Sequence, residues 1–110
     1  MVNSNQKGKR GEREVAALLR EYGFEARRGQ QFAGGGDSPD IVHNIPGYHI
    51  EVKYTEKFQL WPAMDQANHD KKWKPDVPLV FHRKSRRPWV VVIPAKDFLK
   101  IMRELEDGKH

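Results

Sequence analysis

The stretch of sequence that decides the fold is DIVHNIPGYHIEVKYT, which spans residues 40–55. It contains two runs rich in β-branched and aromatic residues, 40–44 and 47–55, joined through a turn around Pro46 and Gly47. Runs of this length that are bounded by turn residues predict two consecutive β-strands. We therefore expect the stretch to supply two strands of a β-sheet.

The second of these strands carries an acid and a lysine on one face. Because side chains alternate across a strand, Glu51 and Lys53 share a face with His49 and Thr55, and they lie roughly 6.5–7 Å apart. At that spacing a carboxylate can hold a metal while the ammonium reaches a water or phosphate oxygen beside the metal. A solvent-facing Glu/Lys pair on an edge strand would show the same pattern.

Asp40 offers a second acid at the start of the first strand, eleven positions before Glu51. Hard oxygen ligands from Asp40 and Glu51, with the backbone carbonyl of Val52 as a neutral ligand, suit Mg²⁺ or Mn²⁺. Such a metal would lower the pKa of water and stabilise negative charge on a phosphodiester, with help from Lys53. The order acid, acid, any residue, lysine therefore predicts a metal-dependent nuclease site. Taken alone, Asp40 could equally be a turn cap.

A third acid lies on the first predicted helix, residues 10–22. On a helical wheel Glu12 shares the buried face with Val15 and Leu19, whereas Glu14 faces solvent. An acid that points toward a core must be paired or bound to a cation, so Glu12 is predicted to complete the site by binding a second metal or its water. The alternative is a first-turn acid that the helix dipole favours.

The rest of the chain predicts one α/β domain over residues 1–110, with a central mixed β-sheet flanked by helices. Gly23 should end the first helix, and residues 1–7 should be disordered. The other predicted elements are a strand at 24–28, a flexible glycine-rich loop at 29–38, a helix at 60–72, strands at 79–83 and 89–93, and a helix at 95–105.

Two apolar patterns in the second half of the chain carry further predictions. The unbroken run Val90-Val91-Val92-Ile93 predicts a strand that is buried on both faces. The last helix carries its apolar residues on one side, and these are Phe98, Ile101, Met102 and Leu105.

Composition narrows the function classes. The chain has no cysteine, so oxygen or histidine must hold any metal. It has no apolar run of membrane-spanning length and no secretory signal, which predicts an intracellular protein. Its histidines lack a paired ligand spacing and are predicted to be solvated or structural; they include His43, His49, His69 and His82.

The formal net charge of +5 is unevenly distributed. Residues 71–87 hold seven basic residues against one acid, a net +6, and the first 28 residues hold seven against four, a net +3. This asymmetry is typical of a surface that binds phosphates, although a solvated charged face is the alternative. The candidate DNA-binding residues in the second region are Lys72, Lys74, Arg83, Lys84, Arg86 and Arg87, with Trp73 as a candidate for stacking on bases.

The site residues and their surroundings resemble the PD-(D/E)XK nuclease superfamily and, within it, the archaeal-type Holliday junction resolvases of archaea and some bacteriophages. The resemblance covers roughly the first half of the chain and lies in KRGERE at 9–14, Leu18-Leu19, Gly23-Phe24, Arg27-Arg28, PDIV at 39–42 and IEVK at 50–53. It implies a restriction-endonuclease-like core with Glu12, Asp40, Glu51 and Lys53 as the catalytic positions.

The same resemblance implies a substrate and a partner. Arg13 and one of Arg27 or Arg28 would contact DNA phosphates, and Gln66 stands where relatives often place a polar site residue. The family forms homodimers whose two sites cut opposed strands of a four-way junction with Mg²⁺. Asp37, in the glycine-rich loop, is a second acid that could be mistaken for Asp40.

The sequence thus predicts an Mg²⁺-dependent, structure-selective DNA endonuclease, in first place a Holliday junction resolvase that acts as a homodimer on branched DNA. One alternative is another PD-(D/E)XK nuclease, such as a nickase, a flap nuclease or a restriction-type enzyme, which need not coordinate two sites. The other is a non-catalytic nucleic-acid-binding module, whose acids would be structural and would bind no metal.

Overall fold

The computed structural model describes residues 4–29, 40–72 and 74–108. The elements in chain order are α1 (Ser4–Glu21), β1 (Ala26–Arg28), β2 (Ile41–His43), β3 (Tyr48–Tyr54), α2 (Leu60–Asp70), β4 (Val77–Arg83), β5 (Val90–Val92) and α3 (Ala95–Asp107). This is the predicted order of helices and strands. Within the described residues, no helix combines the length and the apolar character needed to cross a membrane.

The strands form one mixed sheet and one small antiparallel pair. β3 pairs with β4 in parallel, which places Glu51 opposite Val80, and β5 pairs with β4 in the antiparallel direction. β1 and β2 pair with each other. A parallel β3–β4 connection requires a crossover, and α2 supplies it. The predicted mixed sheet is confirmed, and β3 is one of its edges.

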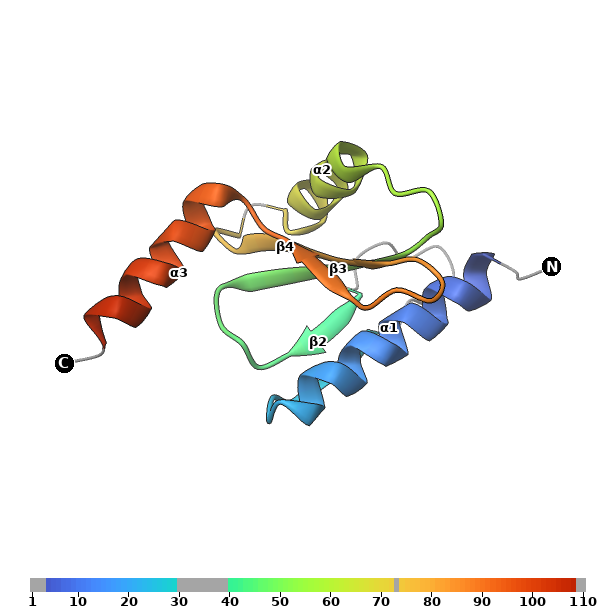
Figure 1. Ribbon diagram of the computed structural model, residues 1–110, viewed down its shortest axis with the longest axis horizontal. Coiled ribbons are helices and arrows are strands. Elements are labelled where there is room, and N and C mark those ends of the chain that lie inside the picture. Colours follow the sequence, from blue (N-terminus) through green and yellow to red (C-terminus); the bar gives the residue numbers. More distant parts are fainter. Residues whose placement is uncertain (1–3, 30–39, 73, 109–110) are drawn as a thin grey trace.

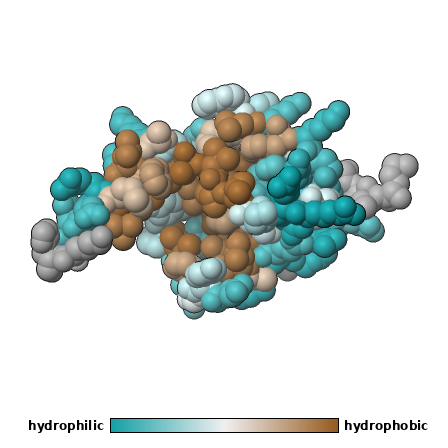
Figure 2. All heavy atoms as spheres, in the orientation of Figure 1, coloured by the Kyte–Doolittle hydropathy of each residue, from teal (hydrophilic) through white to brown (hydrophobic). Residues whose placement is uncertain are grey.

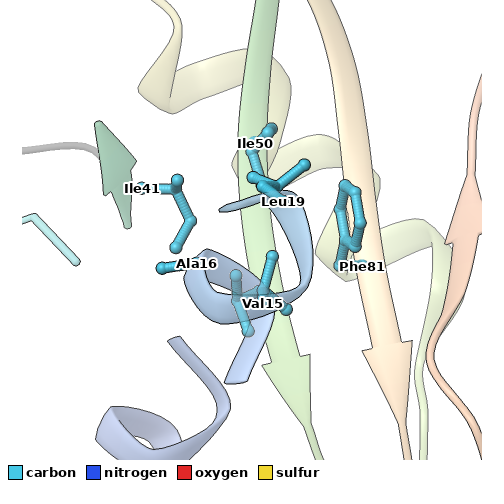
Figure 3. Close-up of a cluster of buried hydrophobic side chains, with 7 residues drawn as sticks. Val15, Ala16, Leu19, Ile41, Ile50 and Phe81 are labelled. Carbon is cyan, nitrogen blue, oxygen red and sulfur yellow. The ribbon is translucent and has the colours of Figure 1, made fainter. Parts of the chain in front are cut away.

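Helices α1 and α2 cover opposite faces of the mixed sheet (Figure 1). On the α1 face the core comprises Val15, Ala16, Leu19, Ile41, Ile50, Val52 and Phe81 (Figure 3). On the α2 face a smaller cluster comprises Ala63, Met64, Ala67 and Val80. Alternation therefore sends the even-numbered residues of β3 toward α1 and the odd-numbered ones toward α2.

Two glycines set the position of α1. Gly23 ends the helix as predicted, with a φ of 91° that a side chain would disfavour. Gly11 lies against the sheet, where an added Cβ would stand 3.0 Å from the Cβ of Tyr54 and 3.3 Å from the Trp89 ring. The absence of a side chain at Gly11 lets the helix approach the sheet closely, and this brings the neighbouring Glu12 to the edge of β3.

The start of α1 differs from the prediction. The helix begins at Ser4 instead of residue 10, so residues 4–7, which were expected to be disordered, are helical. Their apolar content is too low to signal this extension, but Lys7 is held by an ion pair to Glu56 at 2.6 Å. Residues 1–3 and the part of the predicted loop from 30 to 38 lie outside the described residues.

The prediction that Val90–Val92 is buried on both faces is wrong. Val90 is 51% exposed and Val91 is 46% exposed, because β5 is the far edge of the sheet, and of its three valines only Val92 packs against the cluster on the α2 face. The helix that follows does not cover it either: α3 has no buried residue and projects from the domain (Figure 1). A run of valines has the same apolar pattern whether the strand is covered or exposed, so the sequence alone does not distinguish the two.

The prediction that Glu14 faces solvent is also wrong. Its Oε1 accepts hydrogen bonds from Arg83 Nη1 at 2.7 Å and from Trp89 Nε1 at 3.1 Å, and the side chain is only 26% exposed. The helical wheel counts only α1 neighbours and omits the end of β4, which passes beside this face of the helix. Glu14 therefore connects α1 to the β4–β5 region, and Trp89 packs against the main core.

Candidate active site

The four predicted catalytic residues come together at the open edge of β3. They line one cleft of about 540 Å³. Glu12 comes from α1, Asp40 directly precedes β2, and Glu51 and Lys53 belong to β3. Gln66, from α2, lines the same cleft. The cleft thus opens between the two helices that flank the sheet, with the strand edge as its floor.

Asp40 is fixed against the backbone of β3. Its Oδ2 accepts a hydrogen bond from the Val52 N–H at 2.9 Å. In a strand the N–H and C=O of one residue point to the same side, so the Val52 carbonyl also faces the side of Asp40. The backbone ligand predicted from sequence is therefore available next to this carboxylate.

Glu51 is a buried acid, and burial disfavours its ionised form. It is 2% exposed, so the reading of Glu51 and Lys53 as a solvent-facing pair on an edge strand fails even though β3 is an edge. Burial, together with the negative charges of Asp40 and Asp70, raises the pKa of Glu51 to about 7. Burial also raises the pKa of Asp40, against the hydrogen bond from Val52. A bound cation would favour the ionised forms of these two adjacent carboxylates.

Glu12 faces the same cleft from α1, as the helical wheel predicts. Its side chain is 14% exposed, and its Oε1 accepts a hydrogen bond from Arg28 Nε at 2.7 Å. Burial and the charge of Asp40 raise the pKa of Glu12, while Arg28 lowers it. Arg28 therefore balances the third acid of the cluster, and its predicted contact with DNA stays a prediction.

Lys53 is oriented by α2. Its Nζ donates a hydrogen bond to Gln66 Oε1 at 2.6 Å. The amide holds the ammonium at the cleft without neutralising it, because a neutral partner leaves the positive charge intact. This gives Gln66 a positioning role that the sequence pattern alone only suggested.

Two further residues lie beside Glu51, and the sequence prediction missed both. His49, on the same face of β3, and Asp70, the last residue of α2, form with Glu51 a group whose ligand atoms lie within 4.8 Å of one another. His49 had been predicted as a solvated or structural histidine. The alternation that placed His49 on the face of Glu51 was the available signal, but nothing in the sequence fixed which residue of α2 would meet it.

The predicted DNA-binding residues occupy three places. Arg13 and Arg27 are exposed near α1 and β1, and Arg83 is held by Glu14. Lys84, Arg86 and Arg87 are exposed in the turn between β4 and β5, whereas Lys72 and Lys74 follow α2. Trp73, Asp37 and Pro39 lie outside the described residues.

One comparison with known proteins identifies this arrangement. The model of the family described as archaeal Holliday junction resolvase (Hjc) matches residues 3–101, whereas no curated protein and no solved structure matches the chain. The matched residues include every described residue of the cleft, and the mixed sheet between helices agrees with the restriction-endonuclease-like fold of that family. The protein therefore belongs to the archaeal Holliday junction resolvase family, whose members are metal-dependent endonucleases that cleave four-way DNA junctions.

Proposed function

We propose that this resolvase uses Mg²⁺, with Mn²⁺ able to replace it, and that Glu12, Asp40, Glu51 and Lys53 are its catalytic residues. The observation that carries the proposal is the pair of buried, adjacent carboxylates of Asp40 and Glu51 beside a lysine that Gln66 holds in the cleft. A structural role would not require two acids to be held together against their mutual repulsion.

The donor set fits a hard divalent cation. Asp40, Glu51 and the Val52 carbonyl provide oxygen ligands at the strand edge, and Glu12 supplies a further carboxylate across the cleft. When bound, Mg²⁺ supplies Lewis acidity that acidifies water and neutralises charge on the phosphate. The raised pKa values of the acids are what a site shows when its cation is part of its charge balance.

The residues of the chain supply the remaining functions. Lys53, held by Gln66, places a positive charge where a phosphate oxygen gains negative charge during attack on phosphorus. Glu12 is held by Arg28 so that its carboxylate stays in the cleft instead of turning to solvent. These contacts fix the geometry before the substrate arrives, which lowers the cost of reaching the transition state.

DNA backbone would approach over the basic turn at residues 84–87. Ser85 anchors this turn by donating its backbone N–H and its Oγ to Glu56 Oε2, at 3.0 and 2.9 Å, and Glu56 itself lines the cleft. The turn that carries Lys84, Arg86 and Arg87 is therefore attached to a residue of the cleft. Phosphate contacts of this kind give affinity and position without reading base sequence, which suits a structure-selective enzyme.

The partner would be a second copy of the chain, bound through the uncovered apolar face of β5 and α3. Val90 and Val91 expose about half of their surface there, and the exposed apolar residues of α3 are Phe98, Leu99, Met102 and Leu105. Hydrophobic residues gather over this part of the molecule, whereas hydrophilic residues dominate the end that holds the start of α1 (Figure 2). A second copy would bury this face and would place two clefts in one particle.

Two measurements test these proposals. The wild type and Asp40→Ala are incubated with a labelled four-way junction and with a linear duplex, in Mg²⁺ or EDTA at fixed salt. We expect paired nicks on opposed strands of the junction, and these nicks should require both Mg²⁺ and Asp40. Cleavage of both substrates would instead indicate another nuclease of this fold, and binding without cleavage would indicate a non-catalytic module.

Light scattering should find a dimer that Leu99→Glu converts to a monomer. A wild type that is monomeric at micromolar concentration would contradict the dimer.

A further inference from the structure

The group His49, Glu51 and Asp70 combines features that a purely structural cluster does not need. It brings a nitrogen donor and two carboxylates to within 4.8 Å of one another at the junction of β3 and the end of α2. Glu51 is shared with the catalytic cleft, but His49 and Asp70 do not line that cleft. The group therefore occupies a position next to the predicted catalytic cation, on the α2 side.

His49 provides an independent sign that something is bound there. Its side chain is 9% exposed, and its Nε2 is buried without a hydrogen-bond partner among the described residues. Glu51 Oε2 lies 3.5 Å away, at the outer limit of a hydrogen bond. A buried ring nitrogen without a partner destabilises the fold, so its retention calls for a ligand.

The packing of β3 on α2 explains why these residues meet. Residues 49, 51 and 53 share one face of the strand, and Gln66 and Asp70 are one helical turn apart on α2. The contact between Lys53 and Gln66 fixes the register, with the strand and the helix running in opposite directions. One turn further along α2, the same register brings Asp70 to the pair of His49 and Glu51.

We propose that His49, Glu51 and Asp70 bind a second divalent cation, distinct from the one beside Asp40. The mixed nitrogen and oxygen donor set favours Mn²⁺, Co²⁺ or Zn²⁺ over Mg²⁺, because imidazole is a poor ligand for Mg²⁺. The inference rests on the proposed nuclease site through Glu51 alone: Oε2 faces His49, and the other carboxylate oxygen remains for the cation next to Asp40. Occupancy of this position would restrain Glu51 and make its orientation depend on which metal is supplied.

The test uses Mn²⁺ alone, because its unpaired electrons report on nitrogen ligands. Untagged full-length protein is titrated with MnCl₂ without DNA, the bound metal is counted by electron paramagnetic resonance, and the ¹⁴N modulation of the electron spin echo is recorded. The wild type is expected to show ¹⁴N coupling from one imidazole. His49→Phe and Asp70→Asn should each bind one equivalent less Mn²⁺, and His49→Phe should lose the ¹⁴N coupling.

A matched control and a second readout separate the outcomes. His69→Gln changes an exposed histidine of α2 one position from Asp70 and should bind Mn²⁺ as the wild type does. Wild-type protein that binds Mn²⁺ without ¹⁴N coupling would overturn the inference, and this result requires no variant to fold. Junction cleavage in Mg²⁺ is measured on the same samples: cleavage without ¹⁴N coupling rejects only the second cation, whereas ¹⁴N coupling without cleavage rejects only the proposed nuclease activity.

Discussion

The two edges of the mixed sheet contrast in what they bury. At the β3 edge, between α1 and α2, carboxylates lie where the fold would otherwise hold apolar side chains, and Glu51 is 2% exposed. At the β5 edge, valines and the apolar side of α3 face solvent, and Leu99 is 63% exposed. Each edge departs from the usual partition of polar and apolar residues in the opposite sense.

The contrast teaches that either departure marks a candidate binding surface. Burial of an ionised acid is unfavourable, and a bound cation can offset this cost. Exposure of an apolar helix face is also unfavourable, and contact with a second protein surface can offset that cost. The part of the sheet between the two edges, where α1 packs on Ile50 and Phe81, follows the ordinary rule and holds both edges in place (Figure 3). Substitutions can test whether the two edges are as independent as this division implies.

The largest expected effect is on catalysis at the β3 edge. Lys53→Met removes the ammonium that Gln66 orients, and junction cleavage should fall by about 100-fold to 1000-fold, because a fixed donor aimed at developing charge contributes roughly that much. Single-turnover cleavage of a labelled junction measures the change. Lys57→Met, which removes an exposed charge outside the cleft, is the matched control. A Lys53→Met rate within tenfold of the wild type would show that this lysine does not act on the reacting phosphate.

The second effect contrasts a core leucine with a leucine of the β5 edge. Leu19→Ala should lower the free energy of unfolding by about 2–5 kcal/mol, since the side chain is 8% exposed within the main core. Leu99→Ala should change it by less than about 0.5 kcal/mol in dilute, monomeric protein. Urea unfolding monitored by circular dichroism compares the two.

The same pair of leucines distinguishes a covered surface from a merely exposed one. If α3 forms a dimer, the melting temperature of the wild type rises with protein concentration, and that of Leu99→Ala rises less. Equal concentration dependence in both proteins would place the interface elsewhere.

The third effect is a pH dependence of stability that arises at the β3 edge. In the folded chain burial raises the pKa of Glu51 to about 7, above its usual value of 4.5, so the folded state holds the proton over this interval while the unfolded state releases it. In EDTA, stability should therefore fall as pH rises from about 4.5 to 7. Glu51→Gln should weaken this fall and melt a few degrees higher at pH 8, about 4–8 °C for each kcal/mol recovered.

Thermal melts from pH 5 to pH 8 measure this dependence, with Glu21→Gln, an exposed acid of α1, as the control. Added Mg²⁺ should stabilise the wild type at pH 8 and should act less on Glu51→Gln. Parallel curves for the wild type and Glu51→Gln would mean that Glu51 ionises normally in the folded protein.

The smallest expected effect concerns the DNA surface. Arg87→Ala removes one charge from the basic turn, so the slope of log K against log salt for junction binding should shrink by about 0.9, the value for one phosphate contact. Arg103→Ala, on α3 and paired with Asp107, should leave the slope unchanged if the β5 edge does not touch DNA. Fluorescence anisotropy at several salt concentrations measures the slope for both variants. An equal decrease of the slope in Arg87→Ala and Arg103→Ala would show that both edges of the sheet contact DNA.

The sequence prediction succeeds where the interactions that decide the outcome are local in the chain. Glu12, Glu51 and Lys53 could be assigned to their faces because helix and strand periodicity are local properties, and the glycine that ends α1 acts within its own turn. The resemblance of short segments then placed Asp40 with them. All four line the cleft because these local patterns agree with the tertiary packing.

The errors arise where a distant element decides the outcome. Glu14 was assigned to solvent because its partners, Arg83 and Trp89, are 69 and 75 residues away in the chain. The group of His49 and Asp70 depends on the docking of α2 against β3, which no periodicity encodes. The valine run of β5 is apolar in either environment, so its sequence cannot distinguish a covered strand from an exposed one.

The contacts of Glu14 also bear on when the protein becomes able to cut DNA during its own synthesis. The helix that carries Glu12 packs on β3 through its apolar face and is held in addition by residues 83 and 89, which leave the ribosome long after α1 has done so. Contacts of such sequence separation form late, because the chain between them must be ordered first. A nascent chain that has exposed only α1 to β3 therefore presents the acids without Gln66 and without the partners of Glu14, and the cleft is complete only after residue 89 has left the ribosome.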